Sequence, residues 1–97
     1  MGEINESALG FMARETGAVT SEEITRIVEA VKIASKEFPD HFIENPTTKV
    51  DKLKREIFVT KATILYLEGH VPQQHTDRLK SGLYDLRMKL SRIRLVG

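Results

Sequence analysis

Largely apolar residues recur at alternating intervals of three and four between residues 50 and 67, which is the spacing of one face of an α-helix. The stripe consists of Val50, Leu53, Ile57, Thr60, Ile64 and Leu67. From residue 57 onward the other faces are apolar as well, and Lys61 is the only charge. A helix that is apolar nearly all round is buried against neighbours on several sides. We therefore expect a central helix over residues 48–68, with a buried strand at 57–67 as the alternative, because this run is rich in β-branched residues.

The segment from residue 20 to about residue 37 predicts a second helix with well-marked ends. Thr20 and Glu23 have the spacing of a capping box, in which each side chain bonds the other residue's free N–H. Pro39 ends the helix, because the residue before a proline is biased away from helical geometry. The expected core face consists of Ile24, Ile27, Val28, Val31, Ala34 and Phe38. Ile33 points away from that face.

Two more helices are expected, one near each terminus. Residues 3–16 form a short, weak helix that Gly17 stops, and its rough apolar face comprises Ile4, Ala8, Phe11 and Met12. The last helix follows a turn at 70–76, in which Pro72 suits the first helical position. Its stripe has a strict four-three-four-three spacing: Leu79, Leu83, Leu86, Leu90 and Ile93. Residues 39–47 form a linker between two prolines.

These segments predict an all-α fold, a small up-down antiparallel bundle of three long helices and a short N-terminal one. Ninety-seven residues suit a single domain over 1–97, in which residues 1–18 are either loosely ordered and frayed or ordered only by docking. The chain has no cysteine, which excludes disulfides, thiolate zinc sites and cysteine nucleophiles. The longest apolar run is too short to span a membrane and the N-terminus is unlike a signal peptide, so we expect a soluble, cytoplasmic protein.

The net charge of +1 hides a strong asymmetry. Residues 1–46 carry four bases against nine acids, whereas residues 47–97 carry eleven bases against five acids. In an antiparallel hairpin the start of the central helix lies beside the end of the last helix, which gathers a set of cations that we call the basic end. It consists of Lys49, Lys52, Lys54, Arg55, Arg87, Lys89, Arg92 and Arg94.

The first four cations of the basic end lie at the positive pole of their helix, where they do not stabilise it. This placement favours a binding surface for an acidic protein, nucleic acid or anionic lipid. The alternative is a solvated face, or one offset by the acidic N-terminal half. Tyr84 is the only aromatic residue among these charges, and no recognition helix, zinc motif or ribonucleoprotein motif accompanies them, so an acidic protein is favoured over nucleic acid.

A second candidate surface is an outer stripe of Tyr84, Met88 and Leu95, on the face of the last helix opposite its leucines. Apolar side chains on the back of an amphipathic helix need a cover. Either residues 3–16 or another helix of the chain covers them, or they form a homodimer seam or a partner-binding patch, for which exposed aromatic, Met and Arg residues are typical.

Other residues offer little chemistry. His41, His70 and His75 lack metal-ligand spacing, and we expect them to be solvated loop histidines. Lys61 is expected to pack its stem and extend its ammonium group to water. No phosphate-binding glycine loop, nucleophile elbow or paired acids occur at catalytic spacing, so no enzyme activity, catalytic residue, cofactor, metal or small-molecule substrate is expected.

The general layout, a short weak helix followed by three longer ones with the last one basic, is similar to that of small bundle proteins such as the immunity proteins of class II bacteriocins. No diagnostic motif accompanies this likeness of architecture. We expect a non-enzymatic protein–protein interaction module: a small inhibitor, immunity, regulatory or assembly protein that binds through its basic end and outer stripe. The alternative is a nucleic-acid-binding regulator that uses the same basic surface.

Overall fold

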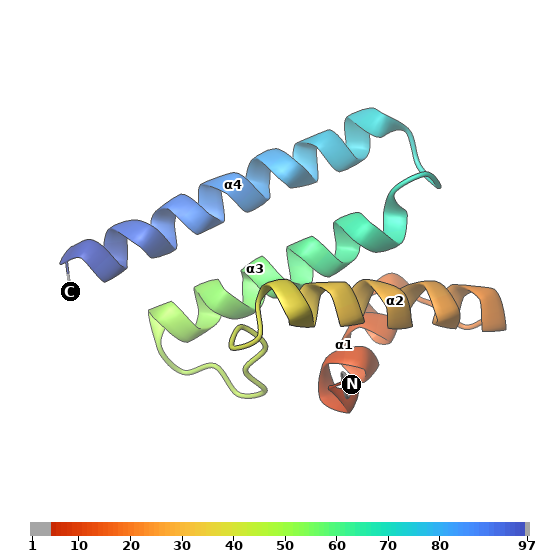
Figure 1. Ribbon diagram of the computed structural model, residues 1–97, viewed down its shortest axis with the longest axis horizontal. Helices are drawn as coiled ribbons and strands as arrows, with labels where there is room; N and C mark the ends of the chain where they lie inside the picture. Colours follow the sequence, from red (N-terminus) through yellow and green to blue (C-terminus); the bar gives the residue numbers. More distant parts are fainter. Residues whose placement is uncertain (1–4, 97) are drawn as a thin grey trace.

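A computed structural model describes residues 5–96 of the chain, and the side chains of residues 5–94. It contains four helices, α1 (Glu6–Thr16), α2 (Ser21–Glu37), α3 (Lys49–Leu67) and α4 (Gln73–Val96), arranged as Figure 1 shows. No strand occurs in the described part of the chain, so the all-α prediction is confirmed and the strand alternative for 57–67 is wrong. The predicted start of the first helix, including Ile4, lies outside the described residues.

The helix ends follow the local sequence signals. The hydroxyl of Thr20 accepts a hydrogen bond from the backbone N–H of Glu23 at 3.1 Å, and the Glu23 carboxylate accepts one from the Thr20 N–H at 3.0 Å. The backbone N–H groups of Thr20 and Val19, which both donate to the Glu23 carboxylate, hold the pKa of Glu23 below its usual value. Gly17 closes α1 with a φ of 71°, a left-handed conformation that glycine adopts without strain. The capping box and the glycine cap are therefore both present as predicted.

The short helix α1 is docked rather than frayed. Ala8 and Met12 are completely buried, and α1 packs against both α2 and α3. The Asn5 side chain accepts a hydrogen bond from the Ala8 N–H at 3.1 Å, which caps the start of the helix. Tertiary packing thus stabilises a helix whose own sequence is weak.

Helix α3 is central, and it packs against each of the other three helices. Its buried residues are Ile57, Phe58, Ala62, Ile64 and Tyr66. On the α2 side, the Arg26 guanidinium lies 4.3 Å from the centre of the Tyr66 ring and donates a hydrogen bond to the Tyr66 carbonyl. Lys61 extends from this apolar helix to the surface and pairs with Glu37 at 3.3 Å, which confirms its expected orientation.

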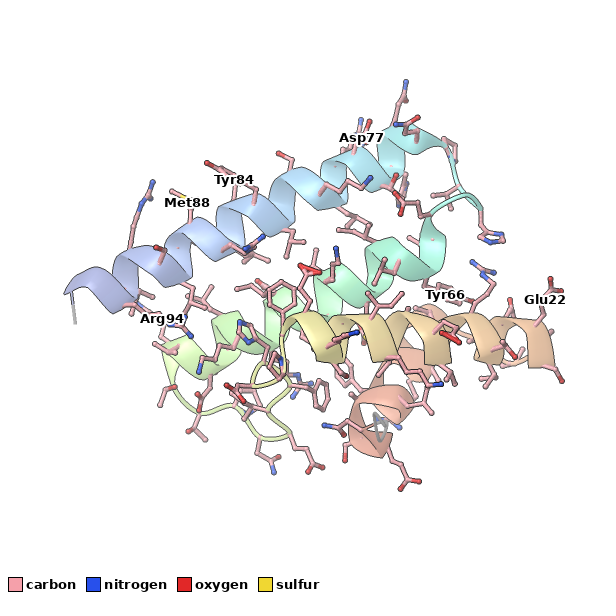
Figure 2. All side chains as sticks on the ribbon, in the orientation of Figure 1. Glu22, Tyr66, Asp77, Tyr84, Met88 and Arg94 are labelled. Carbon is pink, nitrogen blue, oxygen red and sulfur yellow. The ribbon has the colours of Figure 1, made fainter. Side chains whose placement is uncertain are left out.

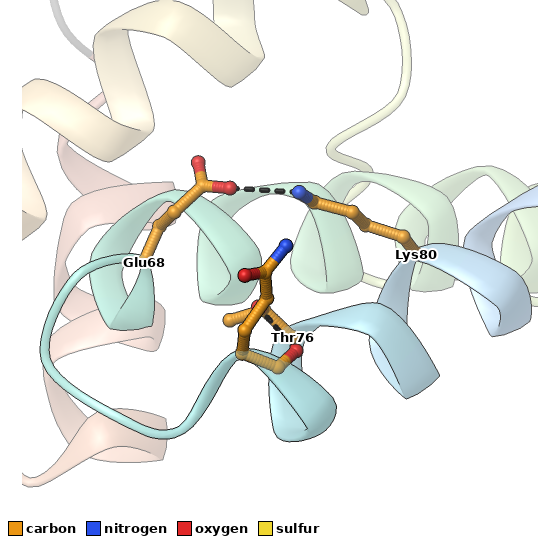
Figure 3. A network of polar contacts seen from close by, with 4 residues as sticks. Glu68, Thr76 and Lys80 are labelled. Carbon is orange, nitrogen blue, oxygen red and sulfur yellow. Dashed lines mark hydrogen bonds and ion pairs between the residues drawn. The ribbon is translucent and has the colours of Figure 1, made fainter.

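Helix α4 packs against α3 and against no other helix of the described structure. The two run antiparallel, as expected, and α4 forms one edge of the molecule (Figure 1). Leu83 and Leu90 of the predicted stripe are buried. Beside the connecting turn, the Lys80 ammonium contacts the Glu68 carboxylate at 2.7 Å, and the Thr76 hydroxyl donates to the Gln73 carbonyl (Figure 3). The exposed ion pair contributes little stability, so the hairpin depends on its leucines.

The loop between α2 and α3 is held by aromatic contacts. The Phe42 ring lies edge-on to Phe11 at 5.8 Å and to Phe58 at 5.4 Å between ring centres. These contacts join α1, the loop and α3, and such pairs are each worth about 0.5–1.5 kcal/mol beyond their buried area. The loop therefore takes a defined path along α1 and α3.

Replacement of Phe58 by Ala should remove about 3–5 kcal/mol from the free energy of unfolding. The change deletes a buried aromatic ring of α3 that packs edge-on against Phe42. Urea denaturation followed by circular dichroism measures the loss. The matched control is Val19→Ala, since Val19 is 82 % exposed and should change the free energy by no more than about 0.5 kcal/mol. A loss below about 1 kcal/mol in Phe58→Ala would show that this ring is not part of the core.

Candidate functional site: the two flanks of helix α4

The antiparallel hairpin brings the start of α3 and the end of α4 to the same end of the molecule (Figure 1). Lys54 from α3 and Arg87 and Arg94 from α4 are all close enough to His41 to act on its ionisation. These three members of the basic end therefore gather around one loop histidine. The exposed members are Lys49, Lys52, Arg87, Lys89, Arg92 and Arg94.

Within residues 5–94 the cations of the basic end form no ion pair. The ion pairs of this part of the chain are Lys61–Glu37 and Lys80–Glu68, and neither involves the basic end. Asp51, Glu56 and Asp85, the nearby acids that the sequence offers, do not pair with it either. This end of the hairpin therefore presents several cations whose charge no described ion pair neutralises.

Arg55 differs from the rest of the basic end. Its guanidinium lies 4.3 Å from the centre of the Phe11 ring and 5.6 Å from that of Phe42. It also donates a hydrogen bond to the Glu44 carbonyl at 3.0 Å. Arg55 thus holds the loop between α2 and α3, a structural use that its charge alone did not indicate.

A hollow of about 250 Å³ opens on the inner flank of α4, and we call it the end pocket. It is lined by Phe38, His41, Ile57, Arg87, Leu90, Ser91 and Arg94. The residues come from the end of α2, the following loop, α3 and α4, so the pocket exists only in the folded chain. Arg94 extends from α4 on the side toward α3 (Figure 2).

His41 lines the end pocket, although the sequence predicted that it is a solvated loop histidine. It is half-buried, and its ring lies 4.9 Å from that of Phe38 between centres. Its Nδ1 atom is buried and has no hydrogen-bond partner within residues 5–94. Burial lowers the pKa of His41, and the cations Lys54, Arg94 and Arg87 lower it further, against a weaker opposing effect of Asp40. The expectation of a solvated histidine is therefore wrong for His41, whereas His70 and His75 are exposed.

The opposite flank of α4 carries the outer stripe. Tyr84 is 64 % exposed and Met88 is 38 % exposed, and Figure 2 shows both on the side of α4 away from α3. They line a shallow hollow of about 330 Å³ together with Asp85, Lys89 and Arg92. The covering alternative is wrong for these two residues, because both are exposed and α3 is the only helix of the described structure that packs along α4. The Leu95 side chain lies outside the described part of the chain.

Other chemistry finds no support in the described part of the chain. Residues 5–94 contain no group of three or more His, Cys, Asp or Glu side chains placed to hold a metal ion. None of the helices within residues 5–96 has both the length and the hydropathy needed to cross a bilayer. The two flanks of α4 are therefore the candidate sites.

Comparison of the chain with protein-family models, curated proteins and solved structures gave no significant match. Function must therefore be inferred from the residues themselves.

The folded protein should lose stability as pH falls below about 6.5, in part through His41. Because its pKa is lowered in the folded state, the unfolded chain takes up the proton first. The loss begins near the unfolded pKa and stops once His41 protonates in the folded protein. Lys54→Met should raise the folded pKa of His41, because Lys54 is the strongest charged influence on it.

The pKa of His41 is measured by NMR titration of its ring, and stability by urea denaturation across the same pH range. The matched control is Lys52→Met, which removes an exposed lysine from the same helix and should leave the His41 pKa near its original value. Equal shifts in the two variants would contradict a local effect of Lys54.

Proposed function

We propose that this chain is a non-enzymatic binding module that uses α4 to contact a protein partner. The observation that carries the proposal is the exposure of Tyr84 and Met88 on a flank of α4 that no described element covers. Side chains that contribute nothing to the core are free to serve a partner. Small inhibitor, immunity, regulatory and assembly proteins all work through surfaces of this kind.

The chemistry of the outer flank suits a protein more than a small molecule. Aromatic, Met and Arg side chains are enriched in protein interfaces, and Met adapts its shape to a partner surface. Tyr84 and Met88 supply the apolar centre, and Lys89 and Arg92 border it. The complementary partner presents apolar side chains ringed by carboxylates, which the positive field of the basic end attracts during encounter.

Met88→Asp should abolish binding to that partner and change the free energy of unfolding by no more than about 1 kcal/mol. The introduced carboxylate would be buried against a partner surface that complements apolar and basic side chains. Nothing on that surface would compensate its negative charge. The matched control is Ile33→Asp, which places the same charge at a 48 % exposed apolar residue of α2. A large loss of stability in Met88→Asp would instead assign Met88 to the core.

The measurement has two stages. A stoichiometric partner is first captured from cells that naturally contain this protein and identified by mass spectrometry. The purified partner is then titrated against the wild-type protein, Met88→Asp and Ile33→Asp by calorimetry. Equal affinity for Met88→Asp and the wild type would contradict the proposal. Self-association that Met88→Asp disrupts would show a homodimer seam instead.

A nucleic-acid-binding regulator is the second candidate, favoured by the unpaired cations of the basic end. If it is correct, labelled DNA or RNA should bind at about 50 mM salt and weaken steeply by about 200 mM, because phosphate contacts release counterions. Fluorescence anisotropy measures both affinities. The triple variant Arg87→Met, Arg92→Met, Arg94→Met should then lose binding that the control Arg14→Met retains. Absence of binding at low salt would remove this candidate.

A further inference from the structure

We propose that the end pocket binds a small organic anion, a carboxylate or phosphate group on a short apolar body. This site is separate from the outer flank that we assign to a protein partner. It goes beyond the expectation from sequence, in which no small-molecule ligand was foreseen. Its residues lie far apart along the chain, so only the fold brings them together.

The floor of the end pocket is apolar. It is formed by three buried residues: Phe38 at the end of α2, Ile57 of α3 and Leu90 of α4. Ligand sites commonly combine such a floor with a few convergent polar groups that fix orientation. At about 250 Å³, the pocket is smaller than the roughly 300–1,000 Å³ of drug-sized sites. Its size suits a single ring or a short chain rather than a nucleotide.

The wall of the end pocket is cationic. Arg87 and Arg94 lie seven residues apart, and therefore about 10.5 Å apart along one flank of α4, and both line the hollow. The Arg87 guanidinium lies 5.7 Å from the centre of the Phe38 ring, which holds it over the floor. Neither arginine pairs with a carboxylate among the described residues. Guanidinium groups bind carboxylate and phosphate through two parallel hydrogen bonds.

His41 is the third group of the end pocket that can carry a positive charge. Its Nδ1 atom is buried and has no hydrogen-bond partner among the described residues. A protonated His41 would add its charge to those of Arg87 and Arg94, and an anion in the pocket would offset it. The groups that act on His41 are Lys54 from α3, Arg87 and Arg94 from α4, and Asp40 from the loop. A bound anion would offset the three cations, so binding and proton uptake should be coupled.

Benzoate and phenyl phosphate are suitable probes, and benzamide is their neutral counterpart. Two-dimensional NMR of the whole chain should show saturable shifts at Leu90, Ser91 and the His41 ring, with a Kd of about 1 mM, typical of a small fragment. Arg94→Met should weaken benzoate binding at least about tenfold, the loss of about 1.4 kcal/mol expected for one charge-assisted contact. Benzamide should not bind measurably.

The matched control is Arg92→Met, which removes the same charge from the same helix outside the end pocket and should change the Kd by less than about twofold. Benzoate should also bind more tightly to the wild type near pH 5.5 than near pH 7.5, and His41→Asn should lose that difference. The proposal is overturned if no saturable shifts cluster at the pocket, if Arg92→Met weakens binding as much as Arg94→Met does, or if benzamide binds as well as benzoate.

Discussion

The apolar surface of α3 must be kept from water on several sides at once, and the other helices are arranged to do so. Phe58 and Ala62 are buried in the core, and α1, α2 and α4 all pack against α3. A single neighbour is enough for α4, because it carries only one leucine stripe. Because α4 has one helical neighbour, its outer flank stays open and carries Tyr84 and Met88, while the end pocket lies on its inner flank beside α3.

Arginines in this protein serve packing as much as surface charge. Arg26 lies over Tyr66, Arg55 lies over Phe11, and Arg87 lies over Phe38. Contacts of this kind are worth about 0.5–1 kcal/mol at exposed sites and more where water is excluded. Arg26 and Arg55 join elements distant in sequence. The count of basic residues in the C-terminal half therefore overstates the charge that is free to bind a partner.

The elements could be predicted from sequence because their signals are local. The capping box of Thr20 and Glu23 acts within the first turn of α2, and Gly17 acts at the last turn of α1. The spacing of Leu83 and Leu90 identifies the buried face of α4. The position of Tyr84 and Met88 on the outer face of α4 could be predicted for the same reason, but their exposure could not, because it depends on which helices pack against α4. The end pocket could not, because His41 reaches α4 only through the path of a loop that has no periodicity. The position of Arg55 over Phe11 likewise depends on how α1 docks, which no local pattern specifies.

The two flanks of α4 differ in how they are coupled to folding. A ligand in the end pocket would contact α4 together with Phe38, His41 and Ile57, and would reduce repulsion among cations carried by α3 and α4. Such a ligand binds only the assembled fold, so it raises the free energy of unfolding by RT ln(1 + [L]/Kd), where [L] is the free ligand concentration. A partner on Tyr84 and Met88 meets a surface that α4 presents by itself. Ligand binding at the end pocket should therefore depend on how the helices pack together, whereas partner binding at the outer flank should depend mainly on α4 itself.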